Sequence, residues 1–189
     1  ADIAGKGHDR FIATSWVGNV CTIAIDKEYS PGSEVEKDLK ELMIRDKIPR
    51  SLTVVDADGV GSFLESYLEG IKEFHGGAQA LDKERYVNKR SECYFKLAEL
   101  INRRKIRIIC TAEQRERIQD ELGALKQATI YNDEAKKAII KKETMKAILG
   151  HSPDYIDALM MAMVFRISKS SNGAKVKVKV IDNNYITRS

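Results

Sequence analysis

Two carboxylates, Asp154 and Asp157, stand at the start of an otherwise apolar helical stretch. Pro153 suits the first position of this helix and Ser152 suits its N-cap, while residues 158–165 are so uniformly apolar that the helix should lie in the core. Aspartates three positions apart share one helix face. Because a carboxylate in an apolar interior is costly unless cations or hydrogen-bond donors satisfy it, we expect partners from elsewhere in the chain.

A purely structural interpretation of these two acids stays open. Asp154 can simply complement the positive end of the helix dipole, and Asp157 can be a hydrogen-bonded residue at the edge of the core. Acids at comparable positions elsewhere in the chain are what would favour a chemical role.

Further acids end predicted strands. Residues 51–56 are a short run rich in β-branched side chains that we expect to form a buried central strand. This strand ends in Asp56, followed by Asp58 and a Gly-Val-Gly turn, and in open α/β sheets ligands bind at that edge. Asp2 would end an earlier strand. Since only one residue precedes Asp2, we expect the chain to have been cut from a longer polypeptide.

These acids predict a metal site if the two strands are neighbours and the helix packs across them. Asp2, Asp56, Asp154 and Asp157 would then converge on one cleft. Carboxylates placed in this way repel one another unless they hold divalent cations, and Mg²⁺ or Mn²⁺ prefers oxygen ligands with positions left for water and phosphate. Two such ions about 3.5–4 Å apart would activate a water and stabilise the leaving oxygen in phosphodiester hydrolysis.

Composition and motifs exclude several classes of protein. The 189 residues fit one domain, no apolar run approaches the roughly 20 residues of a membrane span, and no signal peptide is recognisable. Three widely spaced cysteines argue for reduced thiols and against a disulfide framework or a zinc site. The turn after Asp56 has Leu64 where a dinucleotide fingerprint needs glycine, and no complete phosphate-loop motif occurs.

The periodicity of the sequence predicts a mixed α/β order of elements. A Gly18-Asn19 turn should join two strands as a hairpin, and capping boxes at Ser33, Ser62 and Thr111 should open three helices. The expected strands are residues 11–18, 20–26, 51–56, 70–74, 126–131 and 138–142. The expected helices are residues 33–46, 62–68, 90–103, 111–122, 143–149 and 153–165. A linker is expected at residues 168–173 and a strand with one basic face at residues 174–181.

Three sequence blocks resemble the nuclease domain of the large terminase subunit of tailed bacteriophages: residues 1–10 (ADIAGKGHDR), 55–61 (VDADGVG) and 150–159 (GHSPDYIDAL). Three shorter segments match as well, so that the resemblance covers about residues 1–165: Phe74-His-Gly-Gly77, Tyr86-Val-Asn88-Lys-Arg90 and Lys142-Glu-Thr-Met-Lys146. The resemblance implies an RNase H-like α/β fold, with a mixed central sheet whose first three strands are antiparallel and which is flanked by helices. It also implies a metal-dependent endonuclease that cuts concatemeric double-stranded viral DNA.

The resemblance implies roles for individual residues. Asp2, Asp56 and Asp157 match the three catalytic acids that bind the metal ions, and Asp154 matches an accessory metal position one turn earlier. The implied cofactors are two divalent cations, Mg²⁺ or Mn²⁺.

Two further acids have less defined roles. Asp58 falls where the family pattern is looser, so it ranks below Asp56 as a metal ligand. Asp9 either orients a ligand or a water molecule or stabilises a turn.

Basic clusters are the candidates for contacts with the phosphate backbone, although such clusters are commonly just solvated faces. The net charge of +4 is mild and does not by itself imply nucleic acid. The candidates are Lys142, Lys146, Arg103, Arg104 and Lys105.

The resemblance further implies, for the full-length protein, an N-terminal ATPase motor and the portal and small terminase subunit as partners, in the cytoplasm of the infected bacterial host. Nothing in this sequence matches the motor. We expect a nuclease domain at residues 1–167, a linker and basic C-terminal strand or tail at residues 168–189, no membrane association and a monomeric isolated domain. Two alternatives stay open: another RNase H-like nuclease, such as a junction resolvase or RNase H, and a non-catalytic module that docks on DNA or protein.

Overall fold

The computed structural model describes residues 10–28, 31–57, 67–128 and 136–167. The strands are β1 (Phe11–Val17), β2 (Val20–Lys27), β3 (Val54–Asp56), β4 (Lys72–Phe74), β5 (Arg107–Ile109), β6 (Gln127–Ala128) and β7 (Ala138–Ile139). The helices are α1 (Gly32–Arg45), α3 (Lys89–Asn102), α4 (Ala112–Ala124), α5 (Lys142–Leu149) and α6 (Asp154–Met161), with 3₁₀ turns at η1 (Arg50–Leu52) and η3 (Ala162–Phe165). The expected strand ending at Asp2, most of the helix at residues 62–68 and everything after residue 167 lie outside the described residues.

Strands β1 and β2 form the predicted antiparallel hairpin. Val17 pairs with Val20 across a two-residue turn in which Gly18 has a φ of 56°, a conformation that glycine adopts without steric cost. On its other side β2 pairs in parallel with β5. Strand β5 was not predicted, because three residues are too few to display a period.

Strand β3 is shorter than predicted. Residues Arg50–Leu52, expected to be its first half, instead form the 3₁₀ turn η1 after Pro49. The strand itself covers Val54–Asp56 and pairs in parallel with β4, so that Asp56 lies opposite Phe74 at the carboxyl end of both strands. The prediction that this strand ends at Asp56 is confirmed.

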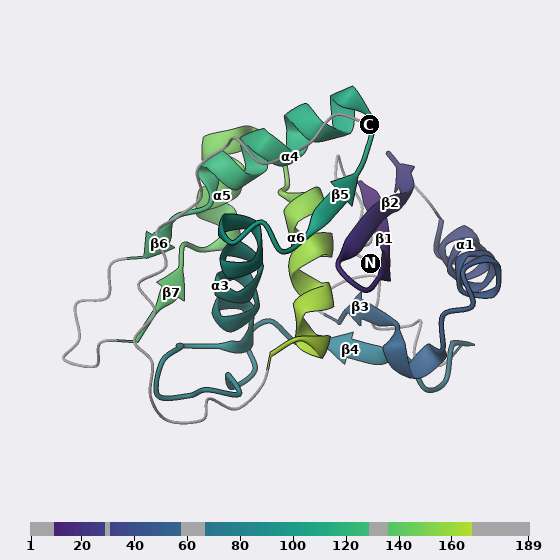
Figure 1. Cartoon of the computed structure of the whole chain (residues 1–189), viewed down its shortest axis with the longest axis horizontal. Helices are drawn as coiled ribbons and strands as arrows, with labels where there is room; N and C mark the ends of the chain where they lie inside the picture. Colours follow the sequence, from purple (N-terminus) through teal and green to yellow (C-terminus); the bar gives the residue numbers. More distant parts are fainter. Residues whose placement is uncertain (1–9, 29–30, 58–66, 129–135, 168–189) are drawn as a thin grey trace.

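Helix α6 is the element around which the others pack. It contacts α3, α4 and β1, and it also reaches β3. Figure 1 shows α6 standing between α3 and the β1–β2 pair. All eight of its residues are buried, the two aspartates included, which confirms the expectation of a core helix.

Two predicted helix caps are wrong. Neither Ser33 nor Ser152 caps its helix: α1 begins after Pro31 and α6 after Pro153, and neither has a side-chain cap. At α6 the backbone N–H of Ile156 instead donates to Glu121 Oε2 of α4 at 2.9 Å. A buried carboxylate from another helix therefore satisfies the start of α6 and complements its dipole.

Two other helix signals were predicted correctly, whereas the capping box expected at Ser62 lies outside the described residues. Thr111 opens α4 with both hydrogen bonds of a capping box. Gly150 ends α5 in the left-handed conformation, with a φ of 78°, as expected of a C-terminal glycine. Of the helices in the described residues, none combines the length and the apolar character that crossing a membrane would require.

Asp26, at the end of β2, ties several elements together. Its Oδ1 accepts a hydrogen bond from the Arg10 guanidinium at 2.7 Å, and its Oδ2 accepts from the Tyr155 hydroxyl at 2.6 Å and from Gln114 Nε2 at 2.8 Å. Burial raises the pKa of Asp26, but these three donors outweigh burial and hold the pKa below its ordinary value. The network joins β2 to α4, to α6 and to the residue that precedes β1.

We expect Asp26→Asn to lower the free energy of unfolding at neutral pH by on the order of 2 kcal/mol, the size of hydrogen bonds to a charged acceptor. Because the folded-state pKa is lowered, this contribution is present above the unfolded-state pKa of about 4 and is lost as pH falls through the lower folded-state value. Urea unfolding at a series of pH values should therefore show the two proteins converging in stability as the solution becomes acidic. A gap that stays constant with pH would contradict the network, and Asp120→Asn, exposed on α4, is the matched control.

Candidate functional site

A cavity of about 540 Å³ opens where the carboxyl end of β3 meets the N-terminal ends of α3 and α5 and one side of α6. Asp56 arrives from β3 and Asp157 from α6, so two acids far apart in sequence share one cavity wall. The N-terminal helix ends bring partial positive charge to the same space. The other polar lining residues are Asn88, Arg90, Lys141, Lys142 and Glu143.

The partners that Asp157 requires come from α3 and α5. Its side chain is 6% exposed; Lys142 Nζ lies 2.7 Å from its Oδ2, and Arg90 Nη2 lies 3.7 Å from its Oδ1. The Tyr94 hydroxyl also donates to Oδ1. Burial, together with the neighbouring charge of Asp157, raises the pKa of Tyr94 well above its ordinary value. Tyr94 therefore keeps its proton and acts as a donor.

Arg90 borders the cavity with unused hydrogen-bonding capacity. Its Nη1 donates to the Ile140 carbonyl at 3.2 Å, and its guanidinium lies over the Tyr94 ring at 5.0 Å. Its Nη2 is buried and makes no hydrogen bond within the described residues. A buried donor without a hydrogen bond calls for a physical explanation, and an anionic ligand in the adjoining cavity would provide one.

The predicted acids do not all converge within the described residues. Asp154 is 4% exposed, and its Oδ2 accepts from the backbone N–H of Arg10 at 2.8 Å, toward the start of β1. Asp2, Asp9 and Asp58 lie outside the described residues. Within the part of the chain that is described, no three His, Cys, Asp or Glu side chains are grouped so that they could hold a metal ion.

The basic candidates fall into two separate places. Lys142 lines the cavity, and Lys146 follows it one turn later on α5. Arg103, Arg104 and Lys105 instead follow the C-terminal end of α3, whose first residues border the cavity. A helix of 14 residues spans about 21 Å, so this second cluster is remote from the cavity. Arg103 also pairs with Glu99 at 2.9 Å.

Sequence reasoning did not identify Tyr94 and Glu121 as partners of α6. Both are buried and both contact α6 from helices distant in sequence. The four-residue spacing of Arg90 and Tyr94 places them on one face of α3, and this was the available signal for a joint site.

Solved structures provide a comparison, whereas no family model and no curated protein matches the sequence. The chain is similar to the nuclease domain of the large terminase subunit gp2 of bacterial virus Sf6, with 21% identity and a TM-score of 0.70 over 86% of this chain and 85% of that chain. Mutant forms of gp2, one with calcium and one with manganese and beta-thujaplicinol, match with the same identity and coverage and a TM-score of 0.67. The predicted resemblance and the mixed α/β fold are thereby confirmed at the level of the fold, with β1 and β2 antiparallel as expected. The strand expected to end at Asp2 lies outside the described residues, so a run of three antiparallel strands stays a prediction.

Removing the Tyr94 hydroxyl should destabilise the protein by about 1–3 kcal/mol, since it takes a donor from a buried carboxylate. The variant is Tyr94→Phe, and urea unfolding measures the change. In a double-mutant cycle with Asp157→Asn, the two changes should couple by about 0.5–3 kcal/mol. Strict additivity would show that the two groups do not interact, and Tyr86→Phe, a half-buried tyrosine that packs on Phe95, serves as the control.

Proposed function

We propose that this chain is the nuclease domain of a viral genome-packaging terminase, an endonuclease that uses two divalent cations to hydrolyse concatemeric double-stranded DNA. The observation that carries the proposal is that Asp56 and Asp157, delivered by different elements, line one cavity with cationic side chains. The fold shared with the Sf6 nuclease domain supports it, as does the order of the three sequence blocks.

The donor chemistry of the cavity fits a divalent cation. Carboxylate oxygens are the ligands that Mg²⁺ and Mn²⁺ prefer, and Asp56 and Asp157 would hold the metal, with Asp2 proposed as the third acid and Asp154 as an accessory. When bound, such ions supply an activated water and stabilise the leaving oxygen. Lys142 neutralises Asp157 from 2.7 Å, so a cation held by Asp157 would compete with this ion pair.

The cations of the cavity fit a phosphate. Arg90 has a buried Nη2 without a hydrogen bond in the described residues, and Lys141 and Lys142 stand beside it on the cavity wall. These groups can orient a phosphodiester through its charged oxygens. Such contacts are the same for every base, so they do not read the sequence. We therefore propose cutting with little sequence preference. The packaging partners are the ATPase motor, the portal and the small terminase subunit, in the cytoplasm of the infected host.

Removing either acid of the cavity should abolish cutting. Loss of an outer-sphere partner already costs about 10–100-fold in metal affinity or activity, so we expect Asp56→Ala and Asp157→Ala to slow plasmid nicking at least about a hundredfold with Mn²⁺ or Mg²⁺. Asp120→Ala, exposed on α4, should cut like the parent. Unchanged nicking by either cavity variant would remove the catalytic assignment.

Two further measurements separate the proposal from its competitors. Calorimetric titration with Mn²⁺ should give binding that Asp56→Ala abolishes, whereas a non-catalytic docking module would show no such dependence. Competition among linear duplex, branched DNA and an RNA/DNA hybrid tests the substrate. Preferred cleavage of the branched DNA or the hybrid would overturn the terminase assignment, but the proposal of a metal-dependent nuclease site would stand.

DNA binding should depend on the basic residues at the cavity. In the absence of divalent cations, Lys142→Ala and Lys146→Ala should each weaken duplex binding and reduce the slope of log K against log salt by about 1. Lys105→Ala, at the remote end of α3, should leave that slope unchanged. Lys146→Ala removes a neighbouring positive charge but keeps the Lys142–Asp157 ion pair. It therefore separates the effect of lost charge from the effect of losing that pair. A larger effect from Lys105→Ala would place the DNA on another face.

A further inference from the structure

A turn with two glycines at its centre borders the candidate site. Gly76 and Gly77 follow β4 and line the same cavity as the two acids. The N–H of Ala78 donates to the His75 carbonyl at 3.1 Å, which closes the turn around the two glycines. Gly76 is buried, whereas Gly77 is exposed at the cavity wall. The turn therefore presents bare main chain to the space that a substrate would enter.

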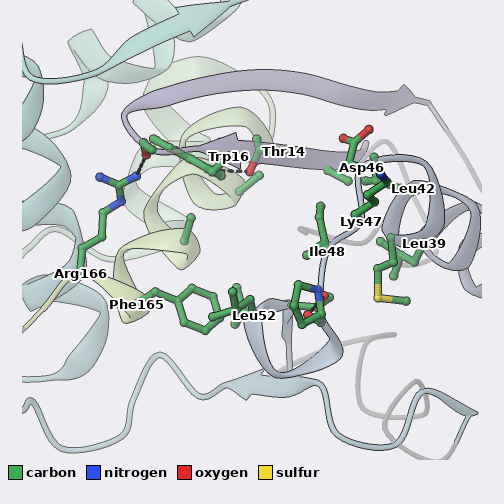
Figure 2. A pocket seen from close by; sticks show the side chains of 18 of the residues that line it. Thr14, Trp16, Leu39, Leu42, Asp46, Lys47, Ile48, Leu52, Phe165 and Arg166 are labelled. Carbon is green, nitrogen blue, oxygen red and sulfur yellow. Dashed lines mark hydrogen bonds between the residues drawn. The ribbon is translucent and has the colours of Figure 1, made fainter.

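The conformation of this turn does not require glycine. Turns that need glycine for steric reasons have a positive φ at a central residue, and among the described residues neither Gly76 nor Gly77 has one. Gly18 provides the contrast. It lines a second cavity, of about 610 Å³, between β1, α1 and the end of α6 (Figure 2), and its φ of 56° accounts for the glycine there.

Packing does not require glycine in this turn either. A Cβ at Gly77 would meet no described atom within 4 Å. A Cβ at Gly76 would make ordinary contacts, at 3.5 Å from Cβ of Arg90 and 3.6 Å from Cε1 of Phe74. Where alanine fits, glycine costs stability, because it has more conformational freedom to lose on folding. The fold thus accounts for neither glycine, and the reason for them should lie in what occupies the cavity.

Two backbone hydrogen bonds hold the turn against the start of α3. The Arg90 N–H donates to the Gly76 carbonyl at 3.0 Å, and the Lys89 N–H donates to the Ala78 carbonyl at 2.8 Å. Among the described residues, the N–H groups of Gly76 and Gly77 donate to no protein acceptor. This wall therefore offers backbone donors beside the Arg90 guanidinium, and both kinds of group bind phosphate oxygens.

We propose that the Gly76–Gly77 turn binds the sugar–phosphate backbone of a nucleic acid, with its N–H groups donating to phosphate oxygens. The absence of two side chains lets the strand approach the main chain closely, which is a use of glycine where backbone meets a ligand. The inference rests on the proposed function, because it takes the substrate of the cavity to be a nucleic acid. It adds a binding surface that neither the acids nor the basic side chains supply.

Duplex binding in the absence of divalent cations tests the turn. We expect Gly77→Ala to weaken binding and Gly77→Leu to weaken it further, by at least about tenfold, because a larger side chain holds the strand farther from the main chain. The donors lost in this way are uncharged. The slope of log K against log salt should therefore stay that of the parent, in contrast to the reduced slope of Lys142→Ala.

The same variants should fold and bind metal normally. Urea unfolding should give Gly77→Ala a midpoint equal to or above that of the parent, since alanine loses less conformational freedom on folding. Calorimetric titration should show unchanged Mn²⁺ binding.

Gly123→Ala and Gly123→Leu are the matched controls. Gly123 is exposed on α4 and lines neither of the two cavities, and a Cβ there would also meet no described atom within 4 Å. Both variants should bind duplex like the parent.

Three outcomes would overturn the proposal. Parental binding by Gly77→Leu would show that the strand does not contact the turn, even though the acids of the cavity could still cut. A reduced salt slope would show that leucine acts by displacing a cation such as Arg90. A lower urea midpoint for Gly77→Ala would show that the fold itself needs glycine there. Failure of the proposed function is distinguishable, because the parent would then show neither duplex binding nor Mn²⁺ binding that depends on Asp56, and both proposals would fall.

Discussion

The burial of one carboxylate in an apolar helix is the constraint on which the rest of this structure depends. Asp157 is buried within α6, and a charge there is tolerated only with compensating partners. Lys142 comes from α5, and Tyr94 and Arg90 come from α3. The need to satisfy a single acid thus fixes how three helices meet, and the cavity forms at their junction.

The same helix start is held from the opposite side by structural acids. Glu121 accepts from the Ile156 N–H, and Asp154 accepts from the Arg10 N–H. The Arg10 side chain is in turn held by Asp26. Asp154 and Asp157 are neighbours on one helix but serve different surroundings: the first connects α6 to the sheet, and the second faces the cavity. The structure thus shows a structural contact for Asp154 and a place on the cavity wall for Asp157, whereas a metal-binding role for either acid stays a prediction.

Local chemistry could be predicted from the sequence, and contacts between distant segments could not. The buried face of α1, formed by Val35, Leu39, Leu42 and Met43, follows from helical spacing alone and is observed. Strand β5 and the cap supplied by Glu121 depend on partners far along the chain, and no short window contains them. Ser152 has the right type for a cap, yet its Oγ is buried without a hydrogen bond in the described residues, because tertiary packing overrode the local preference.

The same division applies to the candidate site. That Asp56 ends a strand and Asp157 enters a core helix was readable from the residues, and both line one cavity. That Tyr94 would donate to Asp157 was not readable, since nothing in the sequence of α3 specifies which residue of α6 it meets. The catalytic and metal-binding roles of these acids stay predictions.

Gly150 has a consequence for the order in which the site assembles. Its left-handed conformation ends α5 only four residues before α6 begins, so Lys142 and Asp157 meet by closing a short loop, at small entropic cost. Asp56 is much farther away along the chain, and its approach requires the sheet to be in place. The ion pair closes within one short segment, residues 142–157, whose contacts are local and can form early in folding, whereas the opposing acid arrives late. A nascent chain would therefore neutralise Asp157 before Asp56 reached the cavity.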